Sequence, residues 1–163
     1  MSKSLGSQLP ADALAMLAGE DLRAGLGHTF TLVVAGEDGF PTVALLSVGE
    51  VLATDASTVR LALWPGSGTT ASLTAAGRAT MMLVGGDAVW YLRLVARRGP
   101  DIGEEGLKRA YFECAVDDVL VDKVTYARIT SGIAFELPEP DKVLDRWQRT
   151  IDLVRRQPAV VVD

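Results

Sequence analysis

The residues best suited to chemistry form one short loop of small and hydroxyl side chains. An alternating apolar run ends at Trp64-Pro65 and gives way to Gly66-Ser67-Gly68-Thr69-Thr70-Ala71, after which the composition is that of a short helix. Backbone N–H groups and the helix dipole converge at such a junction, so the loop is typical of a phosphate cradle. The same residues also suit any tight turn, and the sequence leaves both interpretations open.

The loop is also a formal match to the dinucleotide-binding fingerprint G-x-G-x-x-A. Asp87 follows at about the spacing of the acid that binds the ribose in that motif. The fingerprint requires a helix that crosses over to a parallel strand, whereas 69–77 is long enough for only about two turns. We therefore disfavour a Rossmann fold, and the chain also lacks the Gly-Lys-Ser/Thr of a P-loop.

Few other residues offer catalytic or metal-binding chemistry. His28 is the single histidine and Cys114 the single cysteine, so we expect neither a histidine-based hydrolase triad nor a thiolate zinc cluster. Asp117, Asp118 and Asp122 form an acidic cluster, which we interpret as a turn cap or a solvent-facing group rather than a metal site. The sequence therefore points to no catalytic side chain and no metal ligand.

Composition bounds the class of protein. Of the 163 residues, 48% are apolar and 23% are charged, as in an ordinary globular protein with one core. The net charge of -5 argues against nucleic acid or an anionic membrane surface as a partner. The apolar run 13–19 precedes Glu20 and Asp21, so we interpret it as a helix face and not as a signal peptide. With the lone cysteine, these features predict a cytoplasmic protein with one domain over 1–163.

Hydrophobic periodicity predicts a mainly β protein, of α+β class, with a helix near each end. Apolar residues recur at helical spacing in 10–25 and 138–157 and alternate with a period of two between them. The alternating runs predict strands at 30–34, 43–53 with a bulge or bend at Gly49-Glu50, 59–63, 80–84, 89–97, 110–116 and 127–135. The segment 100–106 is a predicted loop. Tight turns dominate, which favours an antiparallel sheet or barrel.

The order of these motifs resembles the pyridoxamine 5'-phosphate oxidase-like family of split β-barrel flavoproteins. The resemblance covers 30–137, about two thirds of the chain, and rests on the succession of motifs rather than on any one. The motifs are Gly39-Phe40-Pro41 entering the second strand, Ser47-x-Gly49-Glu50, a loop of the G-S-x-T-x-x-S-L type, Gly77-Arg78-Ala79-Thr80, and Ser131-Gly132-Ile133-Ala134-Phe135 closing the sheet. It implies an antiparallel split β-barrel with flanking helices.

The resemblance also implies a binding site. In that family two barrels pair side by side and FMN lies in a groove between the subunits, so the resemblance implies a homodimer that binds FMN. Strand residues near 45–47 would run beside the isoalloxazine ring, and the loop would surround the ribityl phosphate. The implied cofactor-binding residues are Leu45, Leu46, Ser47, Trp64, Ser67, Gly68, Thr69, Thr70 and Ser72.

One departure from the family concerns the phosphate. Members that hold FMN tightly place a Lys or Arg in this loop, where this chain has Gly68 and Thr69. No basic residue occurs between Arg60 and Arg78. Three alternatives follow. FMN is held weakly by hydroxyl and N–H groups, it is held by another arginine such as Arg60, Arg78 or Arg97, or the site has lost it.

Two functions of different classes are compatible with these features. The first is a small flavin-dependent oxidoreductase of unknown substrate, in which the flavin carries the chemistry. A deazaflavin or a haem in the same groove is a related alternative. The second is a cofactor-free dimeric protein that serves in binding or interaction. For either function we expect the dimer to form through an apolar sheet face that includes Val43, Leu45, Val89 and Val95.

Overall fold

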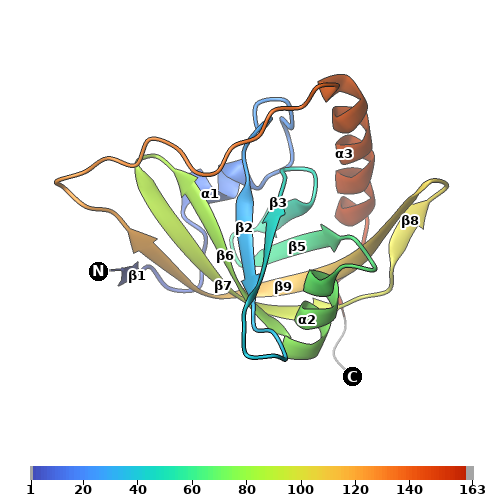
Figure 1. Cartoon of the computed structure of the whole chain (residues 1–163), viewed down its shortest axis with the longest axis horizontal. Coiled ribbons are helices and arrows are strands. Elements are labelled where there is room, and N and C mark those ends of the chain that lie inside the picture. The colour runs from blue at the N-terminus through green and yellow to red at the C-terminus, as the bar shows by residue number, and fades with distance from the viewer. Residues whose placement is uncertain (1, 161–163) are drawn as a thin grey trace.

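The computed structural model of the chain describes residues 2–160. The elements in this range are β1 (Lys3–Ser4), α1 (Ala11–Met16), β2 (Phe30–Val34), β3 (Thr42–Leu46), β4 (Val51–Asp55), β5 (Thr58–Leu63), α2 (Gly68–Ala76), β6 (Arg78–Gly85), β7 (Ala88–Arg98), β8 (Ile102–Glu104), β9 (Leu107–Asp122) and α3 (Pro140–Arg155). Strands dominate and helices flank them (Figure 1), which confirms the mainly β, α+β class.

One curled antiparallel sheet forms the body of the molecule. Its main path runs in the order β3-β2-β6-β7-β9-β5-β4, and β1 and β8 also pair with β9. The 16-residue β9 therefore pairs with β1, β5, β7 and β8 and holds the sheet together. A register shift between Arg93 and Leu94 in the β7–β9 ladder is the kind of irregularity that bends a strand. The sheet curls into a split barrel, with α2 below and α3 at the upper right in Figure 1.

The inner face of the sheet carries the core. Along β7, Trp90, Leu92 and Leu94 are buried, whereas Arg93 and Arg97 are exposed, as the alternation predicts. Neighbouring strands add further side chains that are fully buried, namely Leu32, Leu61, Met81 and Leu83. Each such side chain stabilises the fold by about 1.5–3 kcal/mol relative to an exposed position. Burial of this inner face therefore stabilises the curled sheet.

The predicted strand at 43–53 is interrupted by a full turn rather than by a bulge or bend. β3 ends at Leu46, and Glu50 Oε2 accepts hydrogen bonds from the Ser47 N–H (2.8 Å) and the Ser47 Oγ (2.9 Å). The chain leaves the sheet at this turn and re-enters it at Val51. As a result β3 and β4 lie at opposite ends of the strand order. The turn places Ser47 and Glu50 at the open corner of the barrel, where the candidate site lies.

Two other predictions of secondary structure were wrong. The first helix ends at Met16 instead of near residue 25, because Gly19 has a φ of +65°, outside the range of an α-helix. The strand expected at 127–135 is not formed. Residues 123–139 are irregular. Ala134 in this segment forms an isolated β-bridge with His28. In addition, β1 and β8 were not expected.

The C-terminal helix α3 is close to its predicted range. It begins at Pro140, and proline suits the first turn because its missing N–H would have no helical acceptor. Trp147, Ile151 and Val154 form the buried stripe that the sequence predicts, and the helix contacts β4, β5 and β8. In residues 2–160 we find no helix whose length and apolar character would let it cross a bilayer.

Candidate functional site

The predicted phosphate loop forms the N-terminus of α2. Ser67 Oγ accepts a hydrogen bond from the Thr70 N–H (3.2 Å) and lies 3.1 Å from Thr70 Oγ1, to which it donates. Thr70 Oγ1 in turn donates to the Trp64 carbonyl oxygen (2.8 Å). Ser67 thereby satisfies one of the N–H groups that a helix leaves unpaired at its start. Ser67 and Thr70 together fix the turn that follows β5.

Three donor groups at this helix start have no protein acceptor among residues 2–160. They are the N–H of Gly68, the N–H of Thr69 and the Oγ1 of Thr69. N–H groups at a helix start carry partial positive charge, so these groups suit an anion. The Ser72 hydroxyl is different, because it pairs with Thr42 Oγ1 at 3.0 Å.

A pocket of about 510 Å³ lies beside this helix start. This volume is in the range of small-molecule sites, about 300–1,000 Å³. Six of the nine predicted residues line the pocket, namely Leu45, Leu46, Ser47, Trp64, Ser67 and Thr69. The other three, Gly68, Thr70 and Ser72, belong to α2 but do not line it. The fold thus brings β3 and the α2 loop to one cavity.

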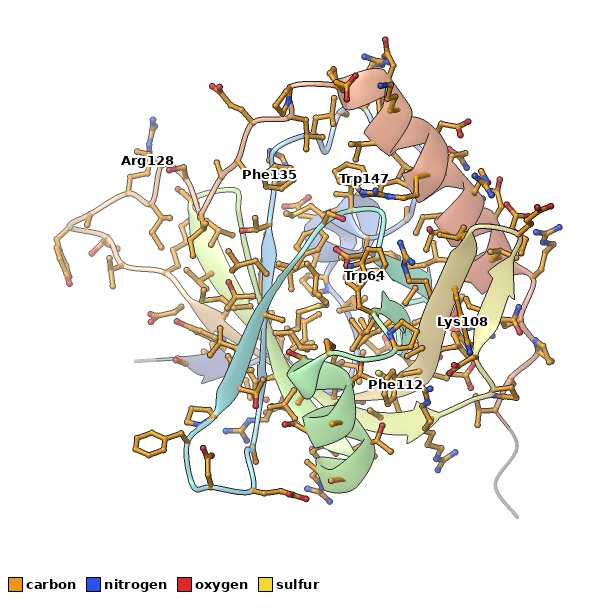
Figure 2. The ribbon with its side chains drawn as sticks, turned by 45° about the vertical axis from the view of Figure 1, so that its right-hand side comes forward. Trp64, Lys108, Phe112, Arg128, Phe135 and Trp147 are labelled. Atoms are coloured by element: carbon orange, nitrogen blue, oxygen red, sulfur yellow. The ribbon has the colours of Figure 1, made fainter. Side chains whose placement is uncertain are left out.

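The opposite wall of the pocket comes from α3 and the segment before it. Trp147 is buried, and its ring meets the ring of Phe135 edge to face, with centroids 6.3 Å apart and planes at 87°. Gly49 lies directly against Trp147, and a Cβ at position 49 would overlap the indole. Figure 2 shows Phe135 and Trp147 on the same side of the ribbon, with Trp64 between α3 and α2. These side chains give the pocket an apolar wall.

Two arginines that sequence reasoning missed also line the pocket, Arg109 of β9 and Arg146 of α3. Arg109 is 4% exposed, and its guanidinium carbon lies 3.9 Å from the centroid of the Trp64 ring. Its Nη1 donates to the Lys108 carbonyl oxygen (2.7 Å), whereas its buried Nε has no partner among the described residues. Burial lowers the pKa of Arg109, the negative charge of Glu50 opposes this shift, and the positive charge of Arg146 adds to it.

The three arginines suggested by the sequence as phosphate partners lie elsewhere. Arg60 is buried on β5, where its Nη2 forms an ion pair with Glu113 Oε2 at 2.9 Å. Arg78 on β6 and Arg97 on β7 are exposed, and neither lines the pocket. The positive charge at the pocket therefore comes from Arg109 and Arg146, and none of the three arginines suggested by the sequence lines this cavity.

Other reactive side chains lie outside the pocket. His28 is exposed at the start of β2, and Cys114 is fully buried in β9, where burial raises the pKa of its thiol. Of the acidic cluster on β9, Asp118 accepts a hydrogen bond from Ser4 Oγ at 2.7 Å. Within residues 2–160 no group of three or more His, Cys, Asp or Glu is arranged to hold a metal ion.

Comparison with known proteins places the chain in a family. It is 31% identical over 141 residues to the uncharacterized protein YclD of Bacillus subtilis (strain 168), a match that covers 86% of this chain and 92% of that protein. The chain belongs to the YclD family. No protein-family model matches it. Membership of this family brings no activity with it, because the relative's name states none.

Solved structures establish the fold of this YclD-family chain. A candidate pyridoxamine 5'-phosphate oxidase from Lactobacillus delbrueckii matches it with a TM-score of 0.56 at 12% identity, over 72% of this chain and 98% of that one. HupZ of Group A Streptococcus matches with a TM-score of 0.55 at 10% identity, over 70% and 99% of the two chains. The split β-barrel fold of the pyridoxamine 5'-phosphate oxidase-like proteins, which the order of motifs implied, is confirmed.

Proposed function

We propose that this YclD-family chain is a cytoplasmic, homodimeric oxidoreductase that binds FMN in the pocket between β3, the start of α2 and α3. The observation that carries the proposal is the pairing of two features in one cavity. Thr69 lines it with an unpaired N–H and hydroxyl, and Leu45 and Leu46 line it with apolar side chains. The fold supports the same proposal. When bound, the flavin would supply the redox chemistry.

The loop before α2 and the lining of the pocket suit the phosphate and the ring of FMN, respectively. Gly66 and Gly68 have open space where a Cβ would stand, so the loop leaves room for a phosphate beside the free N–H groups. Trp147 and Phe135 cover the cavity from the α3 side and exclude water from the ring. None of the described lining residues is a His, Cys, Met or Tyr, the usual axial ligands of haem iron. We therefore favour a flavin over haem, and a deazaflavin with a phosphate would use the same groups.

A second candidate function is a cofactor-free binding protein that keeps the barrel. The uncharged first turn of α2 favours it, because a hydrogen bond between neutral groups contributes about 0.5–1.5 kcal/mol and one to a charged group about 1.5–3 kcal/mol. The absorbance spectrum of the purified protein separates the two functions. Bound oxidised flavin gives bands in the visible and near-ultraviolet, and a cofactor-free protein gives neither.

Gly68→Lys is expected to raise the affinity for FMN about tenfold, whereas the wild type binds FMN and riboflavin about equally. Position 68 matches the family's basic position and has open space for a side chain, whereas Thr69 is 8% exposed. A lysine there adds a charge-assisted bond to the phosphate, and solvent screening reduces its 1.5–3 kcal/mol to about the 1.4 kcal/mol of a tenfold change. Fluorescence-quenching titrations of both proteins with both ligands measure the effect.

Gly66→Lys is the matched control for this experiment. It adds the same charge two residues earlier, also in open space, but before the N-cap Ser67 and not within the first turn of α2, where the N–H groups of Gly68 and Thr69 are unpaired. Riboflavin lacks the phosphate, so its affinity should stay the same in both variants. Equal gains for the two ligands would contradict a phosphate cradle at α2. Failure of all three proteins to bind either ligand would reject FMN and favour the cofactor-free function.

The proposed homodimer rests on the outer face of the sheet. Val43 and Leu45 of β3 are 57% and 51% exposed. Leu45 pairs in register with Thr31, and the row continues through Met82 to Tyr91. Thr31, Met82 and Tyr91 are half-buried. Exposed apolar side chains that lie side by side, as Val43 and Leu45 do on this face, often mark an interface. Since Leu45 also lines the pocket, a second copy on this face would complete the cover of the cavity.

Val43→Arg is expected to convert a dimeric wild type into a monomer at micromolar concentration. Symmetry would place the new charge twice in the desolvated interface, whereas the isolated subunit keeps position 43 in solvent and folds normally. Light scattering coupled to size exclusion gives the mass. Tyr126→Arg, at an 89% exposed position outside this face, should leave the dimer intact. A monomeric wild type would reject both the dimer and a groove shared between subunits.

A further inference from the structure

Arg109 and Arg146 reach the same pocket from two different elements. Arg109 is held in β9 under the Trp64 ring, and Arg146 extends from the exposed side of α3. Glu50 lines the same pocket, and the positive charge of Arg146 helps to lower the pKa of Arg109 whereas the negative charge of Glu50 opposes this shift. The three side chains thus bring the charges of β9, α3 and the turn at 47–50 to one cavity, and we refer to this part of its lining as the charged end.

The charges at this end are not balanced. Glu50 Oε2 already accepts hydrogen bonds from the Ser47 N–H and Oγ. Among the described residues neither Arg109 nor Arg146 forms an ion pair. An arginine stays protonated at physiological pH, so two positive charges face one negative charge. One more negative charge would neutralise this end of the pocket.

The donors of Arg109 indicate which anion would fit. Its Nη1 is used by the Lys108 carbonyl oxygen, and Trp64 covers one face of the guanidinium. The edge formed by Nε and Nη2 remains, and Nε is buried without a partner among residues 2–160. That edge binds carboxylates through two parallel hydrogen bonds. The single excess positive charge also matches a carboxylate, which carries one negative charge, better than a phosphate monoester, which carries nearly two negative charges.

We propose that Arg109 and Arg146 bind the carboxylate of a small organic acid whose apolar body packs against Phe135, Val143 and Trp147. The role of this site as the substrate subsite of an FMN enzyme rests on the proposed function, but binding of the acid itself needs no flavin. The α2 loop and the arginine pair then serve different ligands, the cofactor's phosphate and the acid. Trp64 lies between them, since it lines the pocket with the loop and stacks on Arg109.

The test compares three ligands of one shape on flavin-free protein. Cyclohexanecarboxylate, cyclohexanecarboxamide and cyclohexyl phosphate share an apolar ring and differ in charge. Saturation-transfer NMR titrations measure their affinities. We expect the carboxylate to bind at least tenfold more tightly than the amide and more tightly than the phosphate. Arg109→Gln and Arg146→Gln should each weaken the carboxylate about tenfold and leave the amide unchanged.

Arg149→Gln is the control, because Arg149 lies on the same helix but pairs with Glu104 outside the pocket. It should leave all three affinities unchanged. Arg146 is exposed, so its variant keeps the test valid if Arg109→Gln does not fold. Equal affinities of carboxylate and amide, tightest binding of the phosphate, or no binding of any ligand would each overturn the proposal.

FMN titrations of the same variants separate this inference from the proposed function. If Arg109→Gln removes a preference for FMN over riboflavin and leaves carboxylate binding intact, Arg109 is the cofactor's phosphate partner and the carboxylate subsite is wrong. If carboxylate binding depends on both arginines and no protein binds FMN, the subsite stands and the flavin enzyme is rejected.

Discussion

Replacing Arg60 with methionine is expected to lower the free energy of unfolding by about 3–5 kcal/mol. The ion pair that Arg60 forms with Glu113 is largely buried, with side chains 9% and 16% exposed. Arg60 Nη1 also donates to the carbonyl oxygens of Val154 (3.2 Å) and Gln157 (2.8 Å) at the end of α3. Methionine would leave a buried carboxylate unpaired and remove the link between β5 and α3, and for this reason the loss is large.

Chemical denaturation measures this loss, and a second substitution tests its cause. Glu113→Gln in the Arg60→Met background should recover part of the stability, because it removes the unpaired charge. Its amide oxygen could still accept the hydrogen bond that the Val160 N–H now donates to Glu113 Oε1 (3.0 Å). Arg23→Met breaks a surface pair with Asp141, whose side chains are 64% and 85% exposed, and should cost less than about 1 kcal/mol. Equal losses at Arg60 and Arg23 would contradict a structural role for the buried pair.

The sequence predicted those strands and helices whose formation depends on a pattern within one continuous segment. The hairpins β4–β5 and β6–β7 and the stripe of α3 follow from alternation or helical spacing within one segment. Alternation failed at 127–135, because a pattern does not supply a partner strand, and Ala134 is the residue that bridges there. The break at 47–50 also depends on more than periodicity, since Glu50 must fold back onto Ser47. The single-domain organisation stays a prediction.

The residues of the candidate site also divide into those that a local pattern predicted and those that only the fold brings to the pocket. The α2 loop was predicted because its hydroxyl and glycine residues are contiguous. Arg109 was not, because it comes to lie opposite Trp64 only through the register in which Leu63 pairs with Ala110. Trp147 belongs to an apolar stripe at helical spacing, which is typical of a packing face, and nothing in that spacing indicates that it also lines a cavity. FMN binding, the homodimer and the cytoplasmic location stay predictions for the experiments above.

Trp147→Ala is expected to lower the free energy of unfolding by about 3–5 kcal/mol, as for other large buried aromatic residues. Trp147 is 6% exposed and joins α3 to two other parts of the pocket, the ring of Phe135 and the backbone at Gly49. Its loss leaves a cavity that the surrounding wall can fill only in part. Trp64→Ala is the control, since Trp64 is 55% exposed and its contact with Arg109 contributes only about 0.5–1 kcal/mol.

The contact between Trp147 and Gly49 allows a more specific test of how α3 packs to form the wall of the pocket. Gly49→Ala in the wild type should cost about 1–3 kcal/mol, because the new methyl group would overlap the indole and displace α3. In the Trp147→Ala background the indole is gone, so the same methyl group should cost little or even fill part of the cavity. A double-mutant cycle by denaturant unfolding should therefore give a coupling energy of about 1–3 kcal/mol. Additive losses would mean that the indole does not lie against Gly49, and the α3 wall of the pocket would then be wrong.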